Sequence, residues 1–331
     1  CYLLEDGLYF DTSTVSDYGR LARSNDDAGE SRIDPVAGKR HPQDFAIWRT
    51  SAPGEMRQME WESPWGRGAP GWHLECSVMS QKYLGPQFDI HTGGIDHREI
   101  HHPNEIAQNQ AHSCSTDSGA RMWMHNNFLV DRSGKMSKSS GEFLRVQLLI
   151  DKGYYPLAYR LMCLQAHYRS ELEFSWDGLG AALTRLKRLV MAAAPARDAE
   201  PAGPTDRRLT DLLAKFDAAI SDDLNTPVAL TLLEEAAAMK KIDAGQKRAT
   251  LAAMDAVLGL DLLTIERADL RVRPKTATIT ADEIEATLAR RKEARAAKDF
   301  SASDALRDEL IAAGVEVMDG DPLGWDWRLE A

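Results

Sequence analysis

The stretch GWHLECSVMSQKYLGPQFDIHTGG, residues 71–94, decides the fold class of this chain. Its first half has apolar residues at helical spacing and ends at a glycine, which commonly terminates a helix. Its second half, FDIHTGG, is typical of a short strand followed by a glycine turn. Residues 104–112 predict a further helix, with Pro103 suited to its first turn. Helices that alternate with strands in this way predict an α/β domain with a parallel sheet.

The segments on either side predict different architectures. Residues 1–70 mix short strand-like runs with polar loops, and the Asp-Gly pair in YLLEDGLYF predicts a hairpin. Residues 151–265 have apolar residues at helical spacing throughout, which predicts an all-α bundle. Residues 281–331 predict two helices, a stop at Gly314 and a short strand pair. The predicted fold is therefore α/β, then all-α, then a small α+β unit.

The composition is that of a folded protein from a reducing compartment. The chain has 331 residues, of which 43% are hydrophobic and 27% charged, and it has no apolar run long enough to span a bilayer. Its four cysteines are widely spaced without a CxxC pair, so we expect no disulfide framework and a cytoplasmic location. The net charge of -11 argues against a generally basic nucleic-acid binder, although a local basic face could still hold RNA.

Residues 91–112 hold five histidines, and this density of metal-capable groups suggests a metal site. His101 and Glu105 are four residues apart, so they share one face if the helix has begun. Cys76, on the preceding predicted helix, could reach the same point, and a Cys–His–Glu set with one open position fits catalytic zinc. In the alternative interpretation, His101 and His102 only flank the helix and Cys76 is a small buried apolar residue.

Two further motifs favour contacts with a nucleotide. Gly93 and Gly94 would let the backbone approach a ligand closely, and Asp96 could accept hydrogen bonds from ribose hydroxyls. Lys135 and Lys138 lie in the run KMSKS after a predicted strand, where their charge could stabilise phosphates during adenylyl transfer. A plain glycine turn and an exposed basic loop are the alternatives, and the chain has neither a Walker A loop nor a GxGxxG run.

The run KMSKS is also the second signature of class I aminoacyl-tRNA synthetases. Together with GWHLECS, FDIHTGGID, HHPNEIAQ and HYRSELEFS, it makes the chain resemble the cysteinyl-tRNA synthetases, and the resemblance continues through DDLNTP and ARAAKDFSASDALRDELIAAGVEV. The resemblance implies a partial Rossmann-like catalytic domain, a tRNA stem-contact bundle and a small anticodon-binding domain. The implied boundaries are 1–70 for an insertion in the catalytic domain, 71–150 for its second half with the KMSKS loop, 151–270 for the bundle and 275–331 for the anticodon-binding domain.

The resemblance also implies roles for single residues. The matches are Cys76, His101 and Glu105 as zinc ligands, Trp72 as an aromatic wall beside the substrate cysteine, Gly93, Gly94 and Asp96 as the adenosine-binding turn, and Lys138 as the ATP-contacting lysine with Lys135 assisting. Trp72 has an alternative interpretation, because a tryptophan at this position of a helix could equally be a core residue.

The implied reaction has two steps and needs no side-chain nucleophile. The carboxylate of cysteine attacks the α-phosphate of ATP and releases pyrophosphate, and a ribose hydroxyl at the end of tRNA(Cys) then attacks the adenylate. Catalysis in such a site consists of positioning and charge stabilisation, with Mg²⁺ accompanying ATP. Zinc binds a thiolate far better than a hydroxyl, so serine would be rejected without editing. The expected enzyme is a monomer without a membrane partner.

Within the anticodon-binding domain that the resemblance implies, two groups of residues suit RNA. Arg291, Arg295 and Lys298 are spaced as a stripe on one helix face, which could neutralise phosphates. Trp325 and Trp327 could stack on unpaired bases. Alternatively, the stripe is a solvated face whose cations pair with neighbouring acidic residues.

The chain departs from the family's pattern at its beginning. We find neither the HIGH signature nor the CGxTVYD-like run that carries a further zinc cysteine, and Cys1 does not fit that run. We therefore expect a fragment that lacks one zinc ligand and has impaired activity alone. Two alternative functions share some of the motifs. One is a mycothiol-pathway cysteine ligase, against which the last unit argues, and the other is a non-catalytic tRNA-binding remnant.

Overall fold

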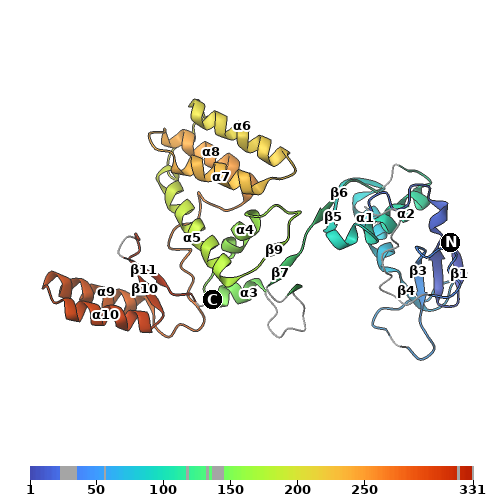
Figure 1. The fold of residues 1–331 in the computed structure, drawn as a ribbon, viewed down its shortest axis with the longest axis horizontal. Coiled ribbons are helices and arrows are strands. Elements are labelled where there is room, and N and C mark those ends of the chain that lie inside the picture. Colours follow the sequence, from blue (N-terminus) through green and yellow to red (C-terminus); the bar gives the residue numbers. More distant parts are fainter. Residues whose placement is uncertain are drawn as a thin grey trace. The chain divides into compact units, whose positions relative to one another are not determined.

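The computed structural model describes residues 1–22, 36–55, 57–116, 119–131, 134–135, 145–318 and 321–329. The chain divides into two compact units, Cys1–Phe128 and Leu129–Ala331, and each unit has hydrophobic clusters of its own (Figure 1). Within the described ranges, no helix combines the length and the apolar character that crossing a membrane requires.

The N-terminal unit begins with a four-stranded antiparallel sheet in the order β1–β2–β3–β4. Its elements are β1 (Tyr2–Leu4), β2 (Gly7–Phe10), the short helix η1 (Thr12–Thr14), β3 (Phe45–Thr50) and β4 (Gly68–Pro70). The predicted hairpin is confirmed, since Leu4 pairs with Gly7 across the turn. Gly7 has a φ of 151°, and a Cβ there would lie 2.0 Å from the carbonyl oxygen of Trp48 on β3, so no other residue fits.

The rest of this unit is a strand–helix–strand arrangement preceded by a helix. The elements are α1 (Trp72–Leu84), β5 (Gln87–Gly94), the short helix η2 (Ile95–His97), α2 (His101–Ser113) and β6 (Gly119–Asn126). Strands β5 and β6 pair in parallel, from Gln87 with Gly119 to Gly94 with Asn126, which confirms the predicted parallel sheet. Both strands therefore end at the same edge, where the chain continues from β5 through η2 into α2. This edge positions the candidate site.

The C-terminal unit begins with a helical bundle around one large core. Its helices are α3 (Val146–Asp151), α4 (Pro156–Leu164), α5 (Trp176–Ala193), η4 (Ala194–Ala196), α6 (Arg207–Ser221), α7 (Thr226–Ala238) and α8 (Ala244–Leu258). Leu179, Leu183 and Leu186 on α5 are at most 2% exposed, as the helical apolar spacing predicts. The strand β9 (Leu172–Glu173) is an exception to the all-helical prediction. It pairs in parallel with β7 (Leu129–Asp131), to which β8 (Gly134–Lys135) is antiparallel.

A small α+β structure ends the chain, as predicted. It consists of α9 (Ala281–Ala296), α10 (Phe300–Ala312), β10 (Val315–Val317) and β11 (Trp325–Trp327). The two helices pack against each other, and the two strands form an antiparallel pair. Gly314 follows α10 with a φ of 80°, which suits the predicted glycine stop. A separate core holds this structure together and consists of Ile284, Leu310, Val315, Trp325 and Trp327.

Candidate active site

The three predicted metal ligands converge in the N-terminal unit. Cys76 lies in the second turn of α1, while His101 and Glu105 lie one turn apart at the start of α2 and share one face of that helix. One ligand atom from each residue lies within 4.8 Å of the other two. His101 and Glu105 are buried and Cys76 is half-buried, so the cluster is closed on the α2 side and accessible on the α1 side.

Glu105 is the central acid of this cluster. Its Oε1 lies 2.9 Å from Nε2 of His101, and its Oε2 lies 3.2 Å from Nε2 of His91. Burial acts to raise the pKa of this carboxyl, but the contacts with His101 and His91 outweigh burial and lower the pKa to about 2. Despite the short distance to His101, Oε1 has no hydrogen-bond donor with suitable geometry in the described part of the chain. Two ligand-type atoms that face each other in this way could share a metal ion.

A second layer of histidines, His73, His91, His102 and His125, surrounds the cluster, and none of them was predicted to support the metal ligands. His73 approaches His101 with 2.8 Å between their Nδ1 atoms, and Nδ1 of His102 lies 2.8 Å from Nε2 of His125. Burial is the main cause that lowers the pKa of His73 to about 4 and that of His102 to about 3. The rings of His73 and His102 are therefore neutral near pH 7.

The contact between His73 and His101 determines which nitrogen of His101 can bind a metal. One of the two Nδ1 atoms must carry the proton that the other accepts. If Nδ1 of His101 donates, its Nε2 is unprotonated and faces Oε1 of Glu105. Metal-bound histidines commonly donate their second N–H to a neighbouring acceptor in this manner. In the sequence, His73 lies one helical turn before Cys76, and this spacing could have indicated that His73 lies beside the metal ligands.

Trp72 forms an aromatic wall beside the cluster. The centroid of its ring lies 4.3 Å from that of His101 and 5.5 Å from that of His97. Trp72 is 57% exposed, so the alternative of a core tryptophan is wrong. Next to it, burial is the main cause that raises the pKa of the Cys76 thiol, and Glu105 and Glu75 add to the effect. The thiol therefore stays protonated near neutral pH unless a cation binds it.

Gly93 and Gly94 end β5, and Asp96 follows in η2. A Cβ at Gly93 would lie 2.7 Å from Nδ1 of His97 and 2.8 Å from two atoms of the His102 ring, so the packing of these histidines requires glycine. A Cβ at Gly94 would lie 2.5 Å from Oδ1 of Asp96. Both glycines thus have a packing role that the sequence did not reveal, and their contact with a nucleotide stays a prediction.

The two predicted phosphate-binding lysines cannot be located as side chains. Lys138 lies outside the described residues, and of Lys135 only the backbone is described, in β8. Their role stays a prediction from the sequence.

The predicted RNA-binding tryptophans are buried. Trp325 and Trp327 are 1% and 5% exposed, and they contact each other edge to face at 5.1 Å inside the small C-terminal core. Stacking on unpaired bases needs an exposed ring face, so this prediction is wrong. The sequence could not distinguish the two cases, because a pair of tryptophans on a short strand can either pack in a core or remain exposed for stacking on bases.

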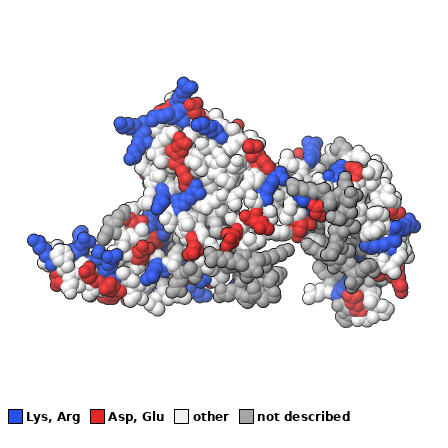
Figure 2. All heavy atoms as spheres, viewed as in Figure 1, with Lys and Arg blue, Asp and Glu red and all other residues white. Residues whose placement is uncertain are grey.

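The predicted basic stripe is interrupted. Arg291 follows Ile284 by two helical turns and shares its buried face of α9, so it is only 9% exposed. Lys298 lies beyond the end of α9 with a φ of 60°. Arg295 and Lys298 are exposed, but the three cations do not form one continuous face. Figure 2 shows acidic and basic side chains interspersed over the visible face, with basic side chains gathered at the edge of the bundle that carries α6.

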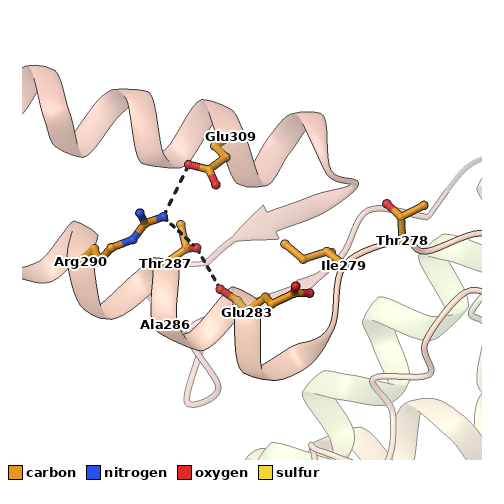
Figure 3. A pocket seen from close by; sticks show the side chains of 7 residues that line it. All are labelled: Thr278, Ile279, Glu283, Ala286, Thr287, Arg290 and Glu309. Carbon is orange, nitrogen blue, oxygen red and sulfur yellow. Dashed lines mark hydrogen bonds and ion pairs between the residues drawn. The ribbon is translucent and has the colours of Figure 1, made fainter.

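A hollow of about 420 Å³ lies beside α9 in the C-terminal unit (Figure 3). Its lining consists of Thr278, Ile279, Glu283, Ala286, Thr287, Arg290 and Glu309. Arg290 and Glu309 form an ion pair of 3.7 Å across it, and each side chain is 58% exposed. A solvated pair of this kind contributes little energy, and we assign no ligand to the hollow.

Comparisons with known proteins identify the chain. Residues 1–184 match the family model of the class I tRNA synthetase (C) catalytic domain, and residues 280–328 match that of the cysteinyl-tRNA ligase anticodon binding domain. The cysteine–tRNA ligase of Novosphingobium aromaticivorans is 68% identical over 337 residues, which cover 99% of this chain and 68% of that protein. The chain belongs to the cysteine–tRNA ligase family.

A second relative agrees with this membership. The cysteine–tRNA ligase of Zymomonas mobilis is 53% identical, with 99% of this chain and 70% of that protein covered. A LeuRS of Agrobacterium radiobacter K84, solved in a ternary complex with tRNA and LeuAMS, aligns at a TM-score of 0.47 and 16% identity over 64% of this chain and 34% of that one, which is too low to carry an argument. The resemblance based on KMSKS and its companion runs is confirmed. The family's enzymes use ATP, and the activity class of this member is aminoacyl-tRNA ligase.

Proposed function

We propose that the protein activates cysteine with ATP, transfers it to tRNA(Cys), and recognises cysteine through a zinc ion held by Cys76, His101 and Glu105. One observation carries the proposal: the three ligand atoms converge within 4.8 Å, in a chain of the cysteine–tRNA ligase family. The sequence alone placed these residues on two separate helices, and their convergence required the fold.

The donor set fits zinc better than it fits other common cations. Sulfur, nitrogen and carboxylate oxygen are the ligand atoms that zinc takes in proteins, whereas Mg²⁺ and Ca²⁺ prefer oxygen alone. The ionised carboxyl of Glu105 and its Oε1 without a hydrogen-bond donor agree with a cation at this point. A bound zinc ion would supply a Lewis-acidic position for the sulfur of cysteine, and its weak affinity for hydroxyl groups would discriminate against serine.

The chain's own residues orient this centre. His91 contacts Oε2 of Glu105 and leaves Oε1 directed at His101, while His73 holds the ring of His101 from the other side. Trp72 lies over His101 on the accessible side, where it would limit the space beside the substrate's sulfur. Selectivity then depends on a fixed geometry rather than on side chains that move to meet the substrate.

The nucleotide would bind at the edge where β5 ends. Ligands of open parallel sheets bind at the carboxyl ends of the strands, which is where Gly93, Gly94 and Asp96 lie. Lys138, with Lys135 assisting, is proposed from the sequence as the contact for the phosphates of ATP, which Mg²⁺ would accompany. Cationic side chains there would stabilise the negative charge that builds on the departing pyrophosphate.

The helical bundle and the small C-terminal structure are the proposed tRNA-binding part. The match of residues 280–328 to an anticodon-binding model supports this assignment. Arg295 and Lys298 are exposed there and are proposed to contact phosphates. Arg291 and the two buried tryptophans are not part of the proposal. We propose that the enzyme acts in the cytoplasm as a monomer.

Cysteine-dependent exchange of pyrophosphate into ATP tests the proposal in the purified full-length protein. We expect exchange with cysteine, weak exchange with serine, and a loss of about 100-fold or more in Cys76→Ser, on the scale of removing one positioned transition-state contact. The control is Cys114→Ser, because Cys114 is exposed at the end of α2 and should not affect exchange. Wild-type exchange by Cys76→Ser would refute the metal assignment, and exchange that does not depend on cysteine would refute the function.

A further inference from the structure

A buried network of charges joins the helical bundle to the small C-terminal structure. Nζ of Lys187, on α5, lies 2.5 Å from Oδ2 of Asp326 on β11. The same oxygen lies 2.5 Å from Nη2 of Arg267, which belongs to the segment after α8. Nε of Arg267 also donates to Oδ2 of Asp321 at 2.9 Å, just before β11. The network therefore connects two residues of the bundle side with two residues of the C-terminal structure.

These four side chains are removed from water. The side chains of Arg267, Asp321 and Asp326 are at most 7% exposed, and that of Lys187 is 15% exposed. Two cations and two anions make the group neutral. The remaining oxygens are also used, since Oδ1 of Asp326 accepts from the backbone N–H of Trp327 and Oδ1 of Asp321 accepts from that of Leu323. Such a network tolerates only one relative placement of its members, because any shift leaves a buried charge unpaired.

The two cores that the network joins are separate. Leu262, Ile265 and Leu270, on either side of Arg267, belong to the large bundle core. Trp325 and Trp327, on either side of Asp326, belong to the small C-terminal core. Arg267 and Asp326 are thus each fixed by packing to a different core, and their ion pair bridges the boundary.

Other contacts cross the same boundary. Leu329 packs against both cores, and it approaches Gly153 so closely that a Cβ there would lie 2.7 Å from its Cδ2. The guanidinium of Arg271 lies 3.7 Å from the centroid of the Trp325 ring, which adds a cation–π contact. Nη1 of Arg271 also donates to the carbonyl oxygen of Trp325 at 3.4 Å. Apolar packing is not directional, so the charged network constrains the orientation more narrowly than the packing of Leu329 does.

We propose that Lys187, Arg267, Asp321 and Asp326 are positioning residues that lock the C-terminal structure at one orientation on the bundle, so that one tRNA molecule can contact both parts at once. The inference rests on the proposed tRNA-binding role of these two parts. None of the four residues needs to touch RNA. They act by holding two RNA-binding surfaces in a fixed relation.

The physical basis is effective concentration. When one part of the enzyme has bound the anticodon end of the tRNA, the second contact becomes intramolecular, and its strength depends on how often the other surface is correctly placed. The backbone N–H of Lys275 still donates to the carbonyl oxygen of Asp151 at 2.8 Å, so without the network residues 276–280 would join α9 to the bundle as a linker of variable direction. Binding of the whole tRNA would weaken, while binding of an isolated anticodon stem-loop would not change, because it engages only one part.

The test compares these two ligands by fluorescence anisotropy at constant salt in the full-length protein. In Lys187→Met, which preserves side-chain length, we expect the Kd for whole tRNA(Cys) to rise about 10-fold and that for the anticodon stem-loop to change less than about twofold. Lys187→Arg retains the charge and should restore most of the affinity. Arg121→Met is the matched control, since Arg121 is a 71% exposed cation of the N-terminal unit, paired with Asp89 and outside both the network and the proposed tRNA-binding part.

Asp326→Asn distinguishes positioning from direct contact of Lys187 with RNA. The substitution removes one negative charge beside Lys187, so the local net charge becomes more positive. Direct contact therefore predicts tighter binding of the whole tRNA, whereas positioning predicts weaker binding. Unchanged affinity of Lys187→Met for whole tRNA overturns the proposal. Equal weakening for both ligands, or equal weakening in Arg121→Met, also overturns it, because the effect would then be unfolding or loss of charge. Wild-type protein that binds neither ligand would instead refute the proposed tRNA-binding role.

Discussion

At the level of single residues, the carboxylate of Glu105 organises the candidate metal centre, because each of its two oxygens contacts a histidine from a different element. The spacing of His101 and Glu105 on one helix predicted their contact, because a helix brings residues four apart onto one face. The contact of Glu105 with His91 was not predictable in this way. His91 lies on β5, fourteen positions earlier, and only the packing of α2 on the sheet brings it to Oε2.

Replacing His91 by alanine should weaken zinc binding without removing any of the three proposed ligands. Glu105 would lose the partner of its Oε2, and the carboxylate could rotate away from the position that a metal requires. We expect zinc affinity, measured by competition with a chelator of known affinity, to fall about 10- to 100-fold, the range for outer-layer partners of metal ligands. His112→Ala is the control, because His112 is exposed on the same helix α2. Equal affinities of the two variants would contradict the positioning role of His91.

Asp223 offers a residue-scale prediction about pH. Its backbone has a φ of 53°, and its carboxylate accepts hydrogen bonds from Tyr168 at 2.6 Å and Arg169 at 2.6 Å. The side chains of Arg169, first, and Tyr168 lower the pKa of Asp223 from 3.8 to about 2. The stabilisation is therefore complete above pH 3.8 and is lost as the pH falls toward 2.

Asp223→Asn should reveal this dependence, since asparagine tolerates the same backbone conformation. We expect a lower melting temperature than wild type at pH 7, and a difference that shrinks once the pH falls below 3.8. Thermal unfolding followed by circular dichroism across this range measures it. Asp222→Asn, the substitution of the exposed neighbour, should show no such convergence. A difference between wild type and Asp223→Asn that is the same at pH 7 and pH 3 would exclude the carboxylate as its cause.

At the level of secondary structure, the sequence predicted the elements well and their faces less well. The helix ending at Gly85, the strand FDIHTGG, the hairpin at Gly7 and the two C-terminal helices were all readable, because local spacing and turn residues determine them. The face of α9 that carries Arg291 was not. A basic residue at helical spacing looks exposed, but α9 buries the face that also carries Ile284 and Thr287. Which face is covered depends on α10 and the strands, which no local pattern of α9 encodes.

The start of α9 depends on a capping box, which gives an element-scale prediction. The Thr280 side chain accepts from the backbone N–H of Glu283, and the Glu283 side chain accepts from the backbone N–H of Thr280. Thr280→Ala leaves the backbone N–H of Glu283 without its acceptor, so we expect the free energy of unfolding of the C-terminal structure to fall by about 1 kcal/mol. Urea unfolding monitored by tryptophan fluorescence can follow the loss, because Trp325 and Trp327 lie in that core. Thr276→Ala, at an exposed position before the cap, should be neutral.

At the level of the whole molecule, the chain consists of two units with separate cores, and the division falls between Phe128 and Leu129. The resemblance placed residues 71–150 together as the second half of a catalytic domain, because the parallel sheet and the KMSKS loop are successive parts of that domain in the family. Compactness divides the chain differently, since β7 pairs with β9 of the later segment rather than with β6. The motifs of a family group residues that take part in the same chemistry. The division into compact units instead groups residues that pack against one another.

The two units should respond differently to removal of the metal. The proposed ligands Cys76, His101 and Glu105 all lie in the N-terminal unit, so bound zinc would stabilise that unit alone, by an amount that grows with the ratio of free zinc to its Kd. After treatment with a zinc chelator, hydrogen–deuterium exchange should rise in the first turns of α1 and α2. Exchange in α5, α7 and α8, within the bundle core, should stay as it was.

Cys76→Ser is the control that assigns the effect to the proposed site: its exchange should already be raised and should not respond to the chelator. A chelator response that is the same in Cys76→Ser and wild type, or that appears in the bundle helices, would place the metal elsewhere.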